Sequence, residues 1–361
     1  MPHLLLAVLI CLSTAFSLPH TVKAETFENT RLVILGTAAG RASWRGSPQG
    51  GVSAAVQVGQ SVYVVDFGRG WADRYHQAGL GPKVGPSGTG GFEYLKAGFI
   101  THMHADHIVD LPQLMLMGFN DGVRKPIQII GPGRNQTGSR QPRSKRAGAL
   151  VNPVNPYPGT IDMINGLIDA FAANFNDALT DVGIPSPKLF YRPRDIEIPT
   201  SAKADGQNVA PLMQPFEIFK DDKVRVTAIL VDHAPIFPSF AFRFDTASGS
   251  IVFSGDTNRH PNLVTLARGA DILVHEVIDG GWVDALMPPN PTPQQQEQAR
   301  HLIKSHTLLS EVGLVAAEAG VGKLVLAHVA PFDLTAKRVA DQAKGFDNIV
   351  LAKPLMDFTL D

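Results

Sequence analysis

The stretch that decides the fold is Thr101-His102-Met103-His104-Ala105-Asp106-His107, in which three histidines and one aspartate fall within six positions. It follows a short apolar stretch that we expect to be a buried strand. On a loop after that strand, the alternating His102 and His104 can face one metal ion, and the adjacent Asp106 and His107 can face a second. Imidazole and carboxylate groups suit Zn²⁺ and similar divalent ions. The stretch therefore predicts a two-metal centre.

Three further candidate ligands stand at the ends of apolar stretches. His233 and Asp256 each follow such a stretch, and His328 ends another. Strand ends suit a metal site because they hold ligands rigidly. Taken singly, each residue has an ordinary alternative role: the histidines in the core or on the surface, and the aspartate in a turn or a helix cap. Their placement relative to the first motif favours ligands.

The composition is that of an ordinary globular protein. The chain has 361 residues, a formal net charge of −1 and 44% hydrophobic residues. Because 32 basic side chains stand against 33 acidic ones, the overall charge argues against a protein that coats nucleic acid. The single cysteine, Cys11, excludes a disulfide scaffold and a thiolate-based zinc cluster.

The N-terminus resembles an export signal. The apolar run from Leu4 to Leu18 is short for a membrane span, and Val22-Lys23-Ala24 supplies small residues for a cleavage site. We therefore expect residues 1–24 to be removed after Ala24, leaving a periplasmic or secreted protein that is not held to a membrane. The alternative is an N-terminal membrane anchor or a buried strand.

The remainder alternates strand and helix patterns. Helices are expected over residues 110–119 and 309–319, among apolar stretches typical of strands at 31–36, 53–58, 61–66, 97–101, 126–130, 224–231, 239–244, 250–254, 271–275, 323–328 and 348–352. This order predicts a layered α/β domain with mixed sheets over residues 25–361, rather than a helical bundle or an all-β barrel.

Residues 132–215 differ from their surroundings and are interpreted as an insertion. They are rich in proline and include a run without acidic residues that holds Arg134, Arg140, Arg143, Lys145 and Arg146. Apolar residues then recur at helical spacing, at Ile164, Leu167, Ile168, Phe171, Phe175 and Leu179. The basic run is either an arm that grips an anionic substrate or a solvated surface loop.

Taken together, these motifs resemble the metallo-β-lactamase superfamily, and in particular its ribonuclease Z and ribonuclease Z-like arylsulfatase branch. The resemblance covers roughly residues 31–355, without most of the insertion, and implies a four-layer αβ/βα sandwich with two mixed sheets. The segments that carry it are Leu35-Gly36-Thr37, Val65-Asp66-Phe67-Gly68, the 102–107 motif, His233, Ser254-Gly255-Asp256-Thr257, His275-Glu276, Ser305-His306-Thr307 and His328.

The resemblance implies a role for each candidate residue. Asp256 would bridge the two ions and Asp66 would orient the histidine loop. The first ion would be held by His102, His104 and His233, and the second by Asp106, His107 and His328. Two Zn²⁺ ions are expected, with Mn²⁺ or Fe as alternatives.

A hydroxide shared by the two ions is the expected nucleophile. Asp106 would accept its proton, and His306, oriented by Glu276, would donate a proton to the leaving group. The alternative for Glu276 and His306 is a buried ion pair that braces two loops. His275 is assigned to structure.

These inferences lead to an exported hydrolase of small anionic esters, either phosphodiesters or aryl sulfates. Hydrolysis of carbonyl substrates such as β-lactams or lactones stays open, because the same nucleophile attacks carbonyl carbon. An inactive metal-binding protein is a further alternative. A transfer-RNA processing nuclease fits the export signal poorly, so no stable nucleic-acid partner is expected. The resemblance is compatible with a homodimer.

Overall fold

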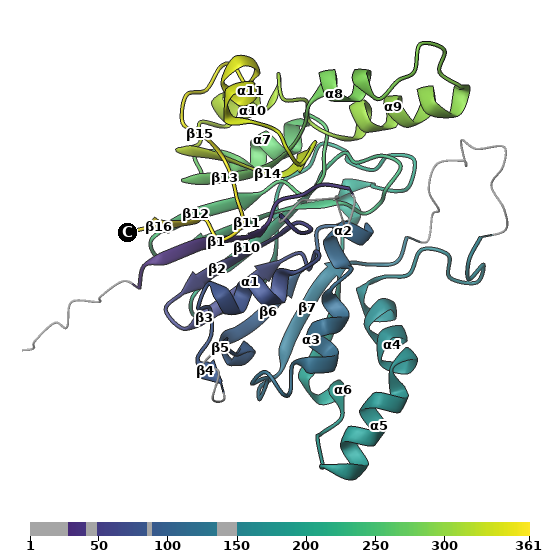
Figure 1. The fold of residues 1–361 in the computed structure, drawn as a ribbon, viewed down its shortest axis with the longest axis vertical. Helices are drawn as coiled ribbons and strands as arrows, with labels where there is room; N and C mark the ends of the chain where they lie inside the picture. Colours follow the sequence, from purple (N-terminus) through teal and green to yellow (C-terminus); the bar gives the residue numbers. More distant parts are fainter. Residues whose placement is uncertain (1–27, 41–48, 85–88, 136–149) are drawn as a thin grey trace, which may run out of the picture.

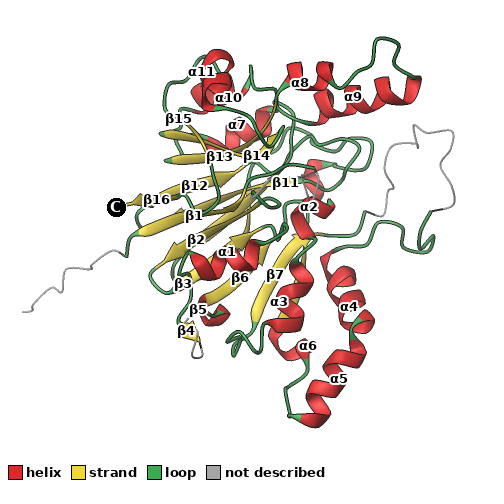
Figure 2. Cartoon of the chain, in the orientation of Figure 1, coloured by secondary structure: helices red, strands yellow, loops and turns green. Residues whose placement is uncertain are grey.

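A computed structural model describes residues 28–40, 49–84, 89–135 and 150–361 (Figure 1). The predicted export signal lies outside these residues, as does most of the basic run. The described chain forms two seven-stranded sheets that pack face to face, with helices on both outer faces (Figure 2). The predicted four-layer sandwich with two mixed sheets is confirmed.

The first sheet is mixed. Its spatial order is β16 (Asp357–Leu360), β1 (Thr30–Gly36), β2 (Ser53–Val58), β3 (Ser61–Val65), β6 (Leu95–Phe99), β7 (Ile127–Pro132) and β8 (Tyr191–Ile196). From β16 to β3 the neighbours are antiparallel, and from β3 to β8 they are parallel. A two-stranded ribbon of β4 (Lys83–Val84) and β5 (Thr89–Gly90) lies outside this sheet.

The second sheet repeats this arrangement. Its order is β9 (Phe216–Lys220), β10 (Arg225–Leu230), β11 (Phe240–Thr246), β12 (Gly249–Phe253), β13 (Ile272–Ile278), β14 (Lys323–Ala330) and β15 (Ile349–Leu351). The pairs from β9 to β12 are antiparallel and those from β12 to β15 are parallel. Because both sheets carry parallel strands, the carboxyl ends of these strands can gather polar groups at one edge of the sandwich.

Three apolar layers hold the sandwich together. Between the sheets lies a layer that includes Phe99, Phe242 and Phe244, all fully buried. Over the outer face of the first sheet pack α1 (Trp71–Gln77), α3 (Leu111–Met117) and α4 (Thr160–Ala170). Over the second sheet pack α7 (Pro261–Ala267), α10 (Val312–Ala319) and α11 (Ala336–Gln342).

The remaining helices lie at the edges of this frame. They are α2 (Ala105–Ile108), α5 (Ala172–Asp181), α6 (Pro187–Phe190), α8 (Gly280–Ala285) and α9 (Pro293–Ser305), with 3₁₀ turns at Phe92–Tyr94 and Thr200–Ala202. Among the helices in the described ranges, none has the length and apolar character that a membrane crossing requires.

The insertion is partly built into the sandwich. Its strand β8 pairs with β7, and α4 packs on the first sheet through Ile164 and Ile168. The single helix expected from the apolar spacing is broken at Phe171 into α4 and α5. No residue of α5 is buried, and Leu179 is 45% exposed. The helical spacing continues past the break, where Phe175 of α5 is partly buried against the apolar layer of the first sheet.

Candidate metal centre

Both sheets contribute residues to one buried polar cluster. From the first sheet, the loop after β6 and the short helix α2 carry His102, His104, Asp106 and His107. From the second sheet, His233 follows β10, Asp256 follows β12, and His328 lies within β14. The structure thus brings together all seven residues that the sequence suggested as ligands.

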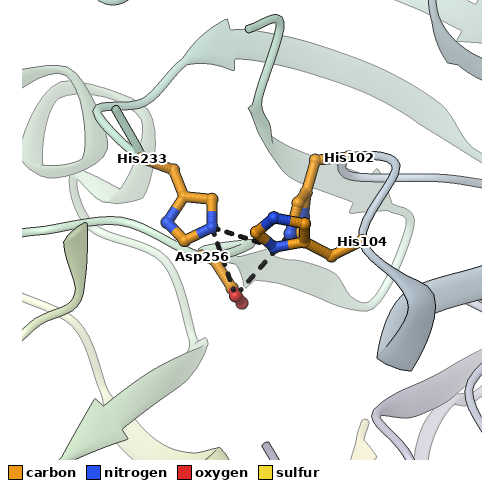
Figure 3. Close-up of side chains that lie close together, drawn as sticks. All are labelled: His102, His104, His233 and Asp256. Atoms are coloured by element: carbon orange, nitrogen blue, oxygen red, sulfur yellow. Dashed lines mark hydrogen bonds and ion pairs between the residues drawn. The ribbon is translucent and has the colours of Figure 1, made fainter. Parts of the chain in front are cut away.

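Four of these side chains form a first group around His104 (Figure 3). Nε2 of His233 lies 3.2 Å from Nδ1 of His104 and 3.8 Å from Oδ2 of Asp256. Nε2 of His102 lies 3.7 Å from the same Asp256 oxygen. Ligand atoms at 2.0–2.2 Å from a tetrahedral ion stand roughly 3.3–3.6 Å from each other, so this spacing fits one ion.

A second group lies on the other side of Asp256. Nε2 of His328 is 3.3 Å from Oδ2 of Asp106 and 3.2 Å from Oδ2 of Asp256. Nε2 of His107 is 3.3 Å from Oδ1 of Asp256 and 3.7 Å from Oδ2 of Asp106. The Asp256 carboxylate therefore contacts both groups, which is the placement that a bridging ligand needs.

The far ring nitrogen of two histidines is fixed by a hydrogen bond. Nδ1 of His107 lies 2.7 Å from Oδ2 of Asp66, and Nδ1 of His233 lies 2.8 Å from the carbonyl oxygen of Ser305. Because carboxylate and carbonyl oxygens only accept, Nδ1 carries the proton and Nε2 is left with a lone pair toward the cluster. The Asp66 carboxylate also accepts hydrogen bonds from the amide and hydroxyl of Thr101.

Several ligand atoms that face the inside of the cluster lack a hydrogen-bond partner among the described residues. Nε2 of His102, of His107 and of His328, and Oδ1 of Asp256, are buried without a hydrogen-bond partner in the described structure. Leaving such groups unpaired costs about 1–3 kcal/mol each, so a cluster of them points to a ligand that the protein itself does not supply. Divalent cations bound in the two groups would satisfy these atoms, and the residues therefore fit a metal.

The charges of the cluster agree with this conclusion. Burial lowers the pKa of His102 and His233 well below the usual range, which leaves both rings neutral and able to coordinate. At His328, burial opposes protonation, but the carboxylates of Asp256 and Asp106 outweigh it and raise the pKa to about 10. The same carboxylates would attract a metal cation in place of that proton.

Glu276 and His306 form a pair beside the cluster. Nδ1 of His306 lies 2.9 Å from Oε1 of Glu276, a residue of β13 that is 2% exposed. Glu276 also accepts a hydrogen bond from the amide of Thr257, next to Asp256. Burial lowers the pKa of His306, but the Glu276 carboxylate outweighs burial, and the pKa is raised overall.

His275, which directly precedes Glu276 in β13, is fully buried. Its Nδ1 lies 2.8 Å from the carbonyl oxygen of Glu276, and burial lowers its pKa to about 4. The ring is therefore neutral, and the described residues place it outside the candidate metal-ligand groups.

Comparison with known proteins identifies the family. No protein-family model matches the chain. Over 287 residues, however, the chain is 30% identical to the ribonuclease Z of Mycobacterium sp. (strain KMS), with 78% of each protein covered. The chain belongs to the ribonuclease Z family.

Solved structures agree with this assignment at the level of the fold. The metallo-β-lactamase fold protein YhfI from Bacillus subtilis superposes with a TM-score of 0.55 at 17% identity, over 92% of this chain and all of the other. The short form of human tRNase Z superposes with a TM-score of 0.56 at 18% identity, over 92% and 99%. This ribonuclease Z family member is a metal-dependent hydrolase of the metallo-β-lactamase superfamily.

The candidate metal centre of this ribonuclease Z family member opens into a cavity of about 650 Å³, which the sequence did not predict. Its wall includes His104, Asp106, Asp256, His306 and His328, and it continues along Trp282, Leu286 and His301 of α8, α9 and their flanks. His301, which belongs to none of the motifs of the sequence, also lines this cavity, with its Nδ1 3.0 Å from Oγ of Ser305. No motif marks these wall residues, since α9 is rich in glutamine and has few apolar positions.

Proposed function

We propose that the chain is an exported hydrolase of small anionic esters, a phosphodiester or an aryl sulfate, that works with two zinc ions. The observation that carries this proposal is the hydrogen-bonded pair of Glu276 and His306 on the wall of the cavity that contains the metal cluster. A cavity of about 650 Å³ has the size that small-molecule sites usually have.

The proposed ligand assignment follows the two groups of the cluster. His102, His104 and His233 would hold one ion, and Asp106, His107 and His328 the other, with Asp256 between them. When bound, two divalent ions would lower the pKa of a water toward neutrality and offset the charge that grows on the attacked ester.

Asp106 is proposed as the proton acceptor. The amide of Gly40 donates a hydrogen bond of 2.7 Å to its Oδ2. Burial would raise the pKa of Asp106, but the positive charge of His107 and His328 outweighs burial and lowers it. The carboxylate therefore stays ionised at neutral pH and can accept a proton from an attacking water.

His306 is proposed as the proton donor to the leaving group. Its Nδ1 is occupied by Glu276, which leaves Nε2 as the nitrogen that can face a substrate oxygen. A ring nitrogen of His306 also lies within 4.8 Å of ligand atoms of Asp256 and His328, so the competing role is a metal ligand. The hydrogen bond to Glu276 favours the role of proton donor, because the Glu276 carboxylate holds the His306 ring in place and keeps the ring protonated.

The small-ester proposal differs from what the names of the relatives state. The names of the relatives, ribonuclease Z and tRNase Z, indicate that those proteins act on RNA. Assays of the zinc-loaded protein on bis-p-nitrophenyl phosphate, p-nitrophenyl sulfate, nitrocefin and a lactone would test the proposal. Turnover of either of the first two supports it. Turnover of only nitrocefin or the lactone, or cleavage of only a precursor transfer RNA, would contradict it.

Replacing His306 by alanine should cost about 10²–10⁴-fold in rate, and more for poor leaving groups than for good ones. The reason is that a poor leaving group depends most on the proton. The measurement is kcat for a series of aryl esters of increasing phenol pKa. His301→Ala is the matched control, because His301 lines the same cavity and its Nδ1 pairs with the hydroxyl of Ser305. An effect of His306→Ala that is equal for all leaving groups would remove the donor role.

The pH profile gives an independent test of Glu276. The Glu276 carboxylate raises the pKa of His306, so the donor stays protonated, and the rate should fall only as the pH rises through that raised pKa. Glu276→Gln removes the negative charge and should move this fall to lower pH, with the zinc content unchanged. A pH profile that does not move would leave Glu276 as a structural residue.

Export is proposed from the N-terminal segment. The apolar run from Leu4 to Leu18 and the small residues at Val22 and Ala24 support cleavage after Ala24. N-terminal sequencing of the protein after cell fractionation would test this. The expected mature protein begins at Glu25 and is found outside the cytoplasm, whereas a cytoplasmic protein that retains residues 1–24 would contradict export.

A further inference from the structure

Two cavities meet at the metal cluster. The first is the cavity of about 650 Å³ under α8 and α9, here called the α8–α9 cavity, whose outer wall includes Trp282, Leu286 and Leu302. The second, of about 470 Å³, is called the Tyr157 cavity. His104 belongs to both walls, so a substrate bound at the cluster can extend into both cavities at once.

The Tyr157 cavity is built by segments from both sheets. Met103 comes from the histidine loop after β6, Tyr157 from the segment before α4, and Ile236 and Phe237 from the loop after β10. These four side chains are each partly exposed. A concave surface of this kind, whose wall includes the aromatic rings of Tyr157 and Phe237, suits an aromatic or other apolar substituent.

The described walls of both cavities lack the cationic side chains that usually bind phosphate backbones: no described lysine or arginine lines the α8–α9 cavity or the Tyr157 cavity. Arg134, the described member of the basic run, instead pairs with Asp162 through an Nε–Oδ2 contact of 2.6 Å. Recognition of a polynucleotide rests mainly on cationic contacts to phosphates, so the described walls favour a ligand whose substituents are apolar.

The position of His306 distinguishes the two cavities. His306 lines the α8–α9 cavity and is absent from the wall of the Tyr157 cavity. A proton donor must lie within reach of the oxygen that leaves. The leaving group of the ester therefore belongs in the α8–α9 cavity, and the substituent that stays on the hydrolysed ester belongs in the Tyr157 cavity.

We propose that the substrate is a phosphodiester with two apolar substituents, the leaving one bound in the α8–α9 cavity and the retained one in the Tyr157 cavity. This inference rests on the proposed function and chooses the phosphodiester over the aryl sulfate, because a sulfate ester carries one organic group and a phosphodiester carries two.

In the reaction, the hydroxyl of water bonds to phosphorus and its proton passes to Asp106. The phosphorus–oxygen bond to the leaving group breaks, and that oxygen takes the proton of His306. The products are an alcohol or phenol and a phosphate monoester.

The test compares methyl 4-nitrophenyl phosphate with phenyl 4-nitrophenyl phosphate, which share a leaving group and differ in the retained group. The zinc-loaded full protein should prefer the phenyl diester in kcat/KM by about 10–100-fold, as expected for an aromatic ring that enters an apolar pocket. Phe237→Ala should lower this preference about tenfold. Trp282→Ala, its matched control in the other cavity, should lower kcat/KM for both diesters and leave the preference unchanged.

Two further measurements protect the test against misfolding. Ile236→Trp fills the Tyr157 cavity instead of emptying it. This variant should no longer hydrolyse the phenyl diester but should still hydrolyse the methyl diester. Calorimetric binding of phenyl phosphate, the retained product, gives a readout without turnover. Its Kd should rise in Phe237→Ala and stay unchanged in Trp282→Ala.

The outcomes separate this inference from the proposed function. If the wild-type protein hydrolyses neither diester nor p-nitrophenyl sulfate, the proposed function fails. If it hydrolyses both diesters equally well, or prefers p-nitrophenyl sulfate to both, the proposed function stands and the two-substituent substrate is overturned. If Trp282→Ala changes the phenyl preference and Phe237→Ala does not, the assignment of the two cavities is overturned.

Discussion

At the scale of the residue, the orientation of each imidazole ring depends on the hydrogen bond made by the ring nitrogen that faces away from the cluster. Asp66 is held by two hydrogen bonds from Thr101 and in turn orients His107. The backbone of Asp66 has a φ of 61°, in the left-handed region that asparagine and aspartate tolerate better than most residues. A single residue at the end of β3 thus fixes both the start of the histidine loop and the tautomer of one candidate ligand.

This arrangement predicts the effect of Asp66→Asn. Asparagine keeps the shape and the backbone conformation, but it removes the charge that orients and polarises His107. We expect zinc affinity to fall by about 10–100-fold, as for other residues that hold a metal ligand in place. Competition with a chromogenic chelator would measure the affinity. Asp271→Asn is the matched control, since Asp271 accepts bonds from the amide and hydroxyl of Ser250, as Asp66 does from Thr101, at the opposite end of β12 from Asp256. Unchanged zinc affinity in Asp66→Asn would show that the hydrogen bond has no part in binding.

At the scale of the element, the histidine loop is held by close contact with glycines. A Cβ placed on Gly68 would lie 2.4 Å from the carbonyl oxygen of Asp106 and 2.5 Å from backbone atoms of Gly51 and Val52. The amide of Phe67 also donates a hydrogen bond of 2.6 Å to the carbonyl of His107. The segment after β3 therefore packs directly on the backbone of α2, without side chains between them.

We therefore expect Gly68→Ala to be destabilising. The atoms in the way are backbone, which cannot rotate aside, so the loop must shift, at a cost of about 1–3 kcal/mol in the free energy of unfolding. Zinc binding should weaken as well, because Asp106 and His107 move with the loop. Gly166→Ala is the matched control: this glycine lies in α4 with nothing within 4 Å of the added carbon, and the change should stabilise by about 0.4–1 kcal/mol. Urea unfolding of both variants measures the difference. Equal stability of Gly68→Ala and the wild type would show that the loop adapts freely.

The elements differ in how well the sequence predicts them. The stretch 53–58 matches β2 residue for residue, since its apolar side chains are buried by the sheets themselves. The seven candidate ligands could be found because their spacing and strand-end positions are local signals. The wall of the α8–α9 cavity could not be found in this way, because Trp282 and Leu302 belong to two different helices whose packing against each other is a tertiary contact. Likewise, no glycine or proline stands at the break at Phe171, so the apolar spacing could not reveal it.

At the scale of the whole molecule, the candidate metal centre joins the two halves of the sandwich. The first sheet supplies the histidine loop, and the second supplies His233, Asp256 and His328. Direct backbone bonds between the halves lie close by: the amide of Val329 donates to the carbonyl of Thr37, and the amide of Phe240 donates to that of Thr101. An ion at this place would therefore act as a cross-link between the sheets as well as a catalytic centre.

Removal of the metal should consequently lower the stability of the entire domain. A ligand that binds only the folded state stabilises it by about 2.7 kcal/mol at a free concentration of one hundred times its Kd. Treatment with EDTA should remove this contribution and leave buried carboxylates and imidazoles facing one another without a cation. The thermal unfolding midpoint of the wild type should therefore fall on EDTA treatment and recover when zinc is restored. His104→Ala loses a candidate ligand of the first group, so its thermal unfolding midpoint should change much less when EDTA is added. A wild-type midpoint that is the same with and without EDTA would mean that the two sheets are not held by a metal ion.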